Sequence, residues 1–108
     1  MQVQINTDHN IDGREALAKH ITSVVENALK HTSEHITRVE VHVSDENSDK
    51  KGGVNEMRCK MEARLAGRQP LAVSHDAPTV HQAVDGAADK LSRLVDHTLG
   101  RIRDLTAR

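Results

Sequence analysis

Residues 36–44, ITRVEVHVS, alternate apolar and polar side chains over their whole length. This period of two predicts a β-strand with one buried face and one exposed face. Three valines would form the buried face, and the exposed face would carry Arg38, Glu40 and His42. The elements before and after this strand decide the fold, because the length of a connection determines how two strands can pair.

Three further stretches predict strands. Residues 56–66, EMRCKMEARLA, alternate in the same way after a polar loop that contains Lys50–Gly53. Residues 70–74, PLAVS, follow a tight turn at Gly67–Gln69, and a proline suits the start of a strand. Near the beginning of the chain, residues 2–6, QVQIN, form a short alternating stretch.

Two other stretches have helical periodicity. The first covers about residues 13–31, with Asp12 as N-cap and Glu15 as its capping-box partner. The second runs from Thr79, which forms another capping box with Gln82, to about residue 104. Its apolar stripe consists of Val80, Val84, Ala87, Leu91, Leu94, Thr98 and Ile102.

The element order is strand, helix, three strands, helix, which predicts an α+β domain with a four-stranded mixed sheet. The long helical connection permits parallel pairing of residues 2–6 with residues 36–44 through a right-handed crossover. The later strands would form an antiparallel meander. Both helices would pack on one face of the sheet, and the other face would expose a set of bases: Arg38, His42, Arg58, Lys60 and Arg64.

Length and composition limit the possible functions. The 108 residues suffice for one domain, residues 1–108, and 29% of them are charged, which is typical of a soluble protein. The chain has no apolar stretch suited to a membrane span or an export signal, and Cys59 has no disulfide partner. We therefore expect a cytoplasmic protein. Phe, Tyr and Trp are absent, so RNA bases cannot stack on such rings.

The charges of the second helix form two groups. The net charge of −1 conceals a basic C-terminal half, since residues 57–108 carry nine Lys or Arg against six Asp or Glu. On a helical wheel, four bases fall within a sector of about 80° beside the apolar stripe. We name them the basic ridge: Lys90, Arg93, His97 and Arg101. Asp85, Asp89 and Asp96 collect in another sector, on the far side of the bases.

Two explanations of the basic ridge remain open at this point. Surface charge usually forms only a solvated helix face, and a ridge of phosphate-binding bases is the functional alternative. Gly86 continues the ridge toward the start of the helix, where glycine costs about 1 kcal/mol relative to alanine. Either close packing of the helix or close approach of an RNA backbone would explain this glycine, and we expect packing.

Residues 83–86 (AVDG), residues 89–91 (DKL) and Arg93 match the pattern of a known helix. They resemble the second helix of the ribosome hibernation-promoting and ribosome-associated inhibitor family. The family's β-α-β-β-β-α domain, similar to a double-stranded-RNA-binding fold, matches the element order predicted above. The resemblance covers nearly the whole chain and is strongest over residues 79–103.

This resemblance implies a short-form ribosome hibernation factor that catalyses no reaction and needs no cofactor or metal. Family members bind the small ribosomal subunit and its ribosomal RNA near the decoding region. There they block the binding of messenger and transfer RNA in stress or stationary phase. The chain would be a monomer off the ribosome, would use no membrane or small-molecule substrate, and would lack the C-terminal domain that pairs ribosomes.

Family members contact ribosomal RNA with basic residues of their helices. The resemblance therefore implies RNA-binding roles for Lys90, Arg93, His97, Arg101 and Arg103 on the second helix. Lys19 and Lys30 on the first helix are further candidates. Some positions depart from the family pattern: His81 replaces an aromatic residue, Leu94 replaces Gln, and Gly100 interrupts the basic tail. The last two changes predict weaker binding.

Other functions have less support in the sequence. The open sheet face could contact RNA, or it could form only cross-strand ion pairs with Glu40 and Glu62. Eight histidines invite a metal site, but zinc requires three or four converging ligands and we expect none. No catalytic arrangement or phosphate-binding loop is recognisable, so we expect no enzyme. The alternative function is a non-ribosomal module on the same scaffold that binds double-stranded RNA or a protein.

Overall fold

The computed structural model describes residues 1–8, 13–46 and 56–106, with side chains up to residue 103. The predicted cap Asp12 and the loop Lys50–Gly53 lie outside the described residues. Every predicted strand and helix is present. In chain order the elements are β1 (Gln2–Thr7), α1 (Arg14–Ala28), the 3₁₀ helix η1 (Lys30–His35), β2 (Ile36–Asp45), β3 (Met57–Leu65), β4 (Leu71–Ala77) and α2 (Val80–Thr106).

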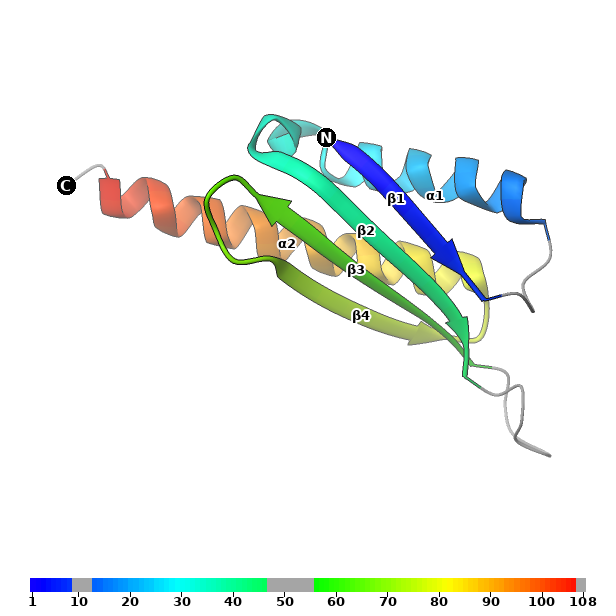
Figure 1. Cartoon of the computed structure of the whole chain (residues 1–108). Coiled ribbons are helices and arrows are strands. Elements are labelled where there is room, and N and C mark those ends of the chain that lie inside the picture. Colours follow the sequence, from blue (N-terminus) through cyan, green and yellow to red (C-terminus); the bar gives the residue numbers. More distant parts are fainter. Residues whose placement is uncertain (9–12, 47–55, 107–108) are drawn as a thin grey trace.

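The four strands form one mixed sheet in the order β1-β2-β3-β4 (Figure 1). β1 and β2 are parallel, with Val3 beside Val39, because α1 carries the chain back between them. The β2–β3 and β3–β4 pairs are antiparallel. Both helices cover the same face of the sheet in Figure 1, which confirms the predicted α+β architecture and the predicted strand pairing.

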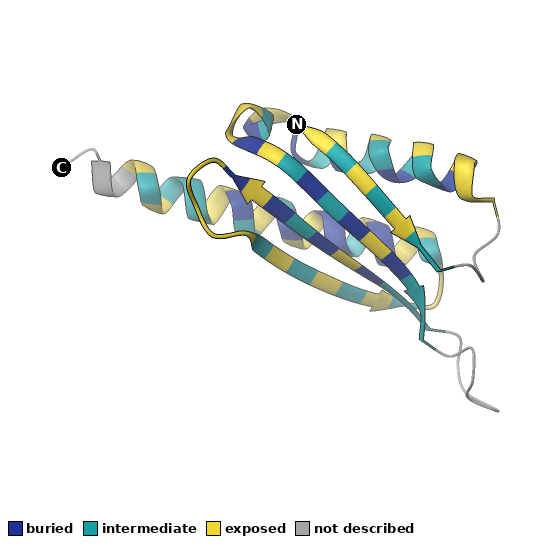
Figure 2. Cartoon of the chain, in the orientation of Figure 1, coloured by how far each residue is buried: buried dark blue, intermediate teal, exposed yellow. Residues whose placement is uncertain are grey.

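Alternation along the strands separates the core from the exposed sheet face. In Figure 2, buried residues alternate with exposed or intermediate ones along β2 and β3. The core contains aliphatic and sulfur-containing side chains only, as a sequence without Phe, Tyr and Trp requires. The strands contribute Ile36, Val39, Val41, Val43, Cys59, Met61, Ala63 and Leu65, and α1 contributes Leu17, Ile21 and Val25.

The buried face of α2 departs from the predicted stripe after Leu91. Leu91 is buried as predicted, but Leu94 is only half-buried, and Val95 takes its place in the core. The reason is that the second half of the helix packs against the end of α1. Ser92 Oγ donates a 3.0 Å hydrogen bond to the carbonyl of Ala28, at the end of α1. The second half of α2 therefore turns its buried face toward α1 rather than toward the sheet alone.

The helix ends follow local side-chain chemistry. The Thr79 hydroxyl accepts a hydrogen bond from the Gln82 N–H and donates one to the Gln82 side chain, both 3.1 Å long. The first bond confirms Thr79 as the N-cap of α2, whereas the Gln82 side chain bonds to the Thr79 hydroxyl and not to the Thr79 backbone N–H that a capping box uses. α1 ends at Ala28, earlier than predicted, and η1 follows it, where the buried Thr32 hydroxyl bonds to a carbonyl one turn earlier. Within the described residues, no helix is long and apolar enough to cross a membrane.

Candidate nucleic-acid interface

The first half of α2 lies very close to the edge strand β4. Gly86 faces His75, and a Cβ atom built at position 86 would overlap the His75 ring. Close packing is therefore enough to explain the glycine, as expected from the sequence. The contact also shows which side of α2 faces β4. On the helical wheel this is the side of the basic ridge.

Lys90, one turn after Gly86, reaches the same strand. Its ammonium group donates a 2.9 Å hydrogen bond to the carbonyl of Ser74, and the side chain stays exposed. β4 pairs only with β3, so its outer edge presents carbonyl groups that no strand satisfies. The bond holds Lys90 along the junction of α2 and β4. Its charge has no carboxylate partner within the described part of the chain.

Arg93 differs from the other bases of the ridge because it has an acidic partner. Its guanidinium group lies 3.0 Å from the Asp89 carboxylate, one helical turn earlier, and its side chain is 80% exposed. The prediction that the acids and bases of α2 are segregated is therefore wrong at this point, where the two sectors meet. Exposed pairs of this kind contribute only about 0.3–0.5 kcal/mol, so a stronger anion can replace Asp89.

His97 and Arg101 complete the basic ridge. Both side chains are exposed, and neither has an ion pair or side-chain hydrogen bond with any described residue. In ideal helix geometry, Arg101 lies about 16 Å farther along the axis than Lys90 and on the same side. Arg103 is exposed too. It lies roughly 140° around the axis from Lys90, so the structure does not bring it into the ridge.

One acid of α2, Asp96, faces the 3₁₀ helix η1. Asp96 Oδ1 lies 2.8 Å from the Nε2 atom of His31 in η1, which places an acid at the junction of α2 with η1. The basic ridge faces the other way, toward β4. Lys19 and Lys30 are exposed on α1 and η1. Both bases therefore belong to elements other than α2.

His81, at the start of α2, contacts the middle of α1. Its ring packs edge-to-face against the ring of His20 in α1, with centroids 4.3 Å apart and an interplanar angle of 68°. The Nε2 atom of His20 is buried and has no hydrogen-bond partner in the described structure. In this protein, position 81 therefore contributes a ring contact between the two helices while its residue stays exposed.

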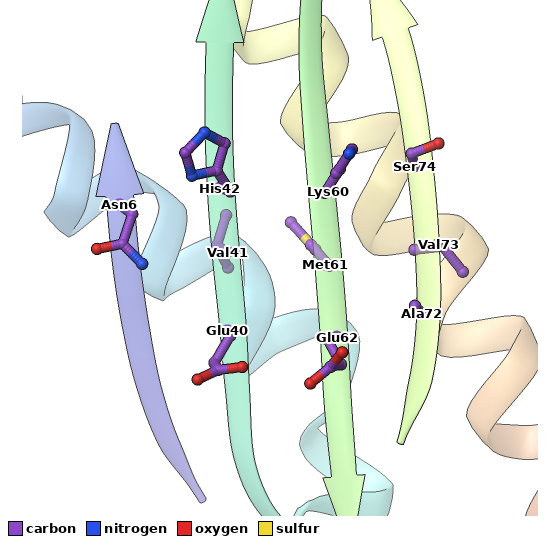
Figure 3. Close-up of a pocket in the computed structure, with 10 residues that line it drawn as sticks. All are labelled: Asn6, Glu40, Val41, His42, Lys60, Met61, Glu62, Ala72, Val73 and Ser74. Atoms are coloured by element: carbon purple, nitrogen blue, oxygen red, sulfur yellow. The ribbon is translucent and has the colours of Figure 1, made fainter. Parts of the chain in front are cut away.

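The open face of the sheet carries the predicted bases, but most of them are paired. Arg64 lies 3.4 Å from Glu62 and 4.0 Å from Glu40. Arg38 lies 3.3 Å from Glu40. Figure 3 shows Glu40 and Glu62 side by side on neighbouring strands, in a shallow hollow of about 560 Å³. The arginines neutralise this pair of carboxylates, so it does not form the isolated acid pair that catalysis would need.

Arg58 forms the best-bonded ion pair on this face. It donates hydrogen bonds of 2.8 and 3.1 Å to the Asp76 carboxylate and lies 2.9 Å from Glu46. The hydrogen bond with Asp76 raises the pKa of Arg58, and it lowers the pKa of Asp76. Among the predicted bases with permanent charge, Lys60 alone has no ion pair with a described residue. Ion pairs within and between strands thus account for most of the bases on this face.

The described residues show neither a metal site nor a reactive thiol. Among the described residues, no group of three or more His, Cys, Asp or Glu side chains could hold a metal ion. Cys59 is buried in the core, and burial raises the pKa of its thiol to about 12. The exposed bases along α2 remain, and their chemistry suits the binding of phosphate groups.

Two solved structures share this fold, each with a TM-score of 0.70. The Protein Y N-terminal domain from Thermus thermophilus is 15% identical, and the match covers 91% of this chain and 99% of that chain. A ribosomal subunit interface protein from Coxiella burnetii is 14% identical, and the match covers 93% of this chain and 99% of that chain. No curated protein sequence matches the chain.

A family model confirms the resemblance seen in the sequence. The model described as Sigma 54 modulation protein / S30EA ribosomal protein matches residues 3–103. This range extends from β1 through the whole of the basic ridge in α2. The chain therefore belongs to the Sigma 54 modulation protein / S30EA ribosomal protein family, a family of ribosome-associated proteins.

Proposed function

We propose that this protein is a ribosome hibernation factor that binds the small ribosomal subunit near the decoding region. In this position it blocks the binding of messenger and transfer RNA during stress or stationary phase. Membership of the family supports a ribosomal partner. The protein acts in the cytoplasm without catalysis, as a monomer off the ribosome.

The observation that carries this proposal is the basic ridge on the side of α2 that faces β4. Lys90 and Arg101 lie about 16 Å apart along one side of a single helix, exposed and without carboxylate partners in the described structure. A helix packed on a sheet holds such charges in fixed positions, which suits contact with several phosphates of a folded RNA. Because the chain lacks Phe, Tyr and Trp, these contacts involve phosphates and sugars rather than stacked bases.

Three further bases have supporting roles in this proposal. Lys19 and Lys30 project from α1 and η1, and Arg103 projects from a different side of α2. A binding site that surrounds the domain would meet all of these sides at once. We expect a smaller loss of affinity from each of them than from Lys90 or Arg101, because they stand apart from the ridge.

The test is co-sedimentation of the purified protein with small ribosomal subunits at several salt concentrations. Arg101→Gln is the most informative variant, because the Arg101 side chain has no ion pair or hydrogen bond with a described residue whose loss would destabilise the fold. Arg14→Gln is the matched control, because Arg14 is also exposed and has no ion pair or hydrogen bond to a described residue, but lies at the start of α1. We expect Arg101→Gln to weaken binding and to reduce the salt slope by about one phosphate contact.

A free RNA duplex in excess distinguishes the ribosomal function from the alternative. A hibernation factor stays with the subunits in the presence of the duplex, whereas a general duplex-binding module transfers to it. The proposal would be contradicted if wild-type protein remained at the top of the gradient at every salt concentration. The charges of α2 would then form only a solvated face.

A further inference from the structure

We propose that Arg68, on the turn between β3 and β4, belongs to the same RNA-binding surface as the basic ridge. This inference rests on the proposed function and extends it to a second element of the fold. No local pattern in the sequence connects residue 68 with α2. The connection comes from the way in which β4 and α2 lie against each other.

Two contacts fix the relative position of β4 and α2. His75 meets Gly86, and Ser74 meets Lys90, so the two elements run in opposite directions. A strand rises about 3.3 Å per residue and a helix about 1.5 Å. The start of β4 is therefore roughly 10–13 Å from Ser74, and this distance corresponds to about seven to nine residues of α2 beyond Lys90. By this estimate the β3–β4 turn lies about level with residues 97–99 of α2, and in Figure 1 the turn lies toward the C-terminal half of the helix.

The turn presents Arg68 to solvent. The Arg68 N–H donates a 3.1 Å hydrogen bond to the Leu65 carbonyl, and Gly67 between them has a φ of 71°. Glycine adopts this left-handed conformation without strain, so the chain reverses tightly at this point. The side chain of Arg68 is exposed and has no hydrogen bond or ion pair with a described residue. The preceding base, Arg64, is instead held by Glu62.

The neighbouring acids do not neutralise this surface. Asp89 pairs with Arg93, and Asp96 faces His31 on the opposite side of α2. Arg68 and Arg101 therefore add two uncompensated positive charges at one end of the junction of α2 and β4, and Lys90 adds a third farther along it. A row of charges of this length fits the repeating phosphates of an RNA strand. One guanidinium group can also donate hydrogen bonds to two phosphate oxygens at once, which makes arginine well suited to bind phosphate at position 68.

The test is the salt dependence of binding to small ribosomal subunits for Arg68→Gln, beside Arg101→Gln and the control Arg14→Gln. We expect Arg68→Gln to weaken binding by about three- to tenfold at low salt and to lower the salt slope by about 0.7–0.9. Arg14→Gln should leave both values unchanged. Circular dichroism and thermal melting should be the same for all variants, because none of these side chains has a partner in the described structure.

Each failure has its own signature. If Arg101→Gln weakens binding and Arg68→Gln keeps the wild-type affinity and slope, the inference is wrong and the proposed function stands. If wild-type protein does not bind subunits at all, the proposed function fails and the inference fails with it. If Arg68→Gln loses affinity but keeps the wild-type slope, then Arg68 contacts no phosphate, and the inference is overturned as well.

Discussion

Gly86 in α2 lies directly against the imidazole ring of His75 in β4, with no room for a methyl group between them. The contact sets the distance between the helix and the edge strand. One turn later the same closeness allows Lys90 to reach the Ser74 carbonyl. The position of the basic ridge therefore depends on a packing contact that involves no charge.

Replacement of Gly86 by alanine should destabilise the fold. Alanine favours a helix by about 1 kcal/mol over glycine, but overlap with the His75 ring should outweigh this gain and give a net loss of about 1–2 kcal/mol. Urea unfolding measures the difference. Gly100→Ala is the control: a Cβ there meets nothing within 4 Å, so this variant should gain about 0.5–1 kcal/mol. Equal stabilisation of both variants would show that the His75 ring moves aside freely.

Removal of the acid beside Arg93 should strengthen RNA binding. In Asp89→Asn the guanidinium group of Arg93 loses its partner at 3.0 Å and becomes available to a phosphate. We expect about twofold tighter binding to small subunits, which corresponds to the 0.3–0.5 kcal/mol of an exposed helical pair, and a steeper salt dependence. Asp96→Asn is the control, because Asp96 faces His31. Unchanged binding by Asp89→Asn would mean that Arg93 does not contact RNA.

Interactions between residues that are close in the sequence were predicted more accurately than contacts between elements that are far apart in the sequence. The Thr79–Gln82 cap and the alternation in β2 are local, and both were predicted. The Asp89–Arg93 pair is also local, but it was missed. A helical wheel gives only the direction of each side chain, and these two side chains are long enough to bridge neighbouring sectors. The contact of Gly86 with His75 and the displacement of Leu94 by Val95 depend on which elements meet in space. The spacing of residues along the chain does not specify such tertiary contacts. For this reason the sequence did not predict that Arg68 lies near the C-terminal half of α2.

The thiol of Cys59 should be unreactive in the folded protein. Its pKa of about 12, raised by burial, leaves almost no thiolate at pH 8. Reaction with a disulfide reagent should therefore be slow in buffer and fast in urea, at a rate that follows unfolding. The raised pKa also contributes stability that is fully present below the ordinary value of 9.0 and is lost as the pH rises through about 12. Rapid labelling without denaturant would contradict the buried position.

The ion pair between Arg58 and Asp76 should contribute to stability in mild acid and neutral solution. Its hydrogen bond lowers the pKa of Asp76 below the ordinary value of 3.8, so the contribution is present above that value. It is lost as the pH falls through the lowered pKa. Thermal melting between pH 6 and pH 2 should show a shallower acid transition for Asp76→Asn than for wild type. Asp85→Asn, on the exposed side of α2, should keep the wild-type profile.

Binding to RNA should strengthen as the pH falls from 8 to 6, because histidines acquire charge in this range. His97 is the histidine of the basic ridge. It is exposed and has no acidic partner in the described structure, whereas His31 and His42 lie beside Asp96 and Asp8. One added charge near a phosphate should contribute up to about 1 kcal/mol at the surface, which is a few-fold change in affinity.

The measurement is the affinity for small ribosomal subunits at pH 8, 7 and 6 and constant ionic strength, for wild type and His97→Gln. We expect the affinity of wild type to rise and that of His97→Gln to change less. His42→Gln is the control, because His42 lies on the open sheet face beside Lys60 (Figure 3), away from the ridge. Affinity that stays flat in wild type would remove His97 from the RNA-binding surface. Parallel curves for wild type and His97→Gln would assign the pH response to other histidines.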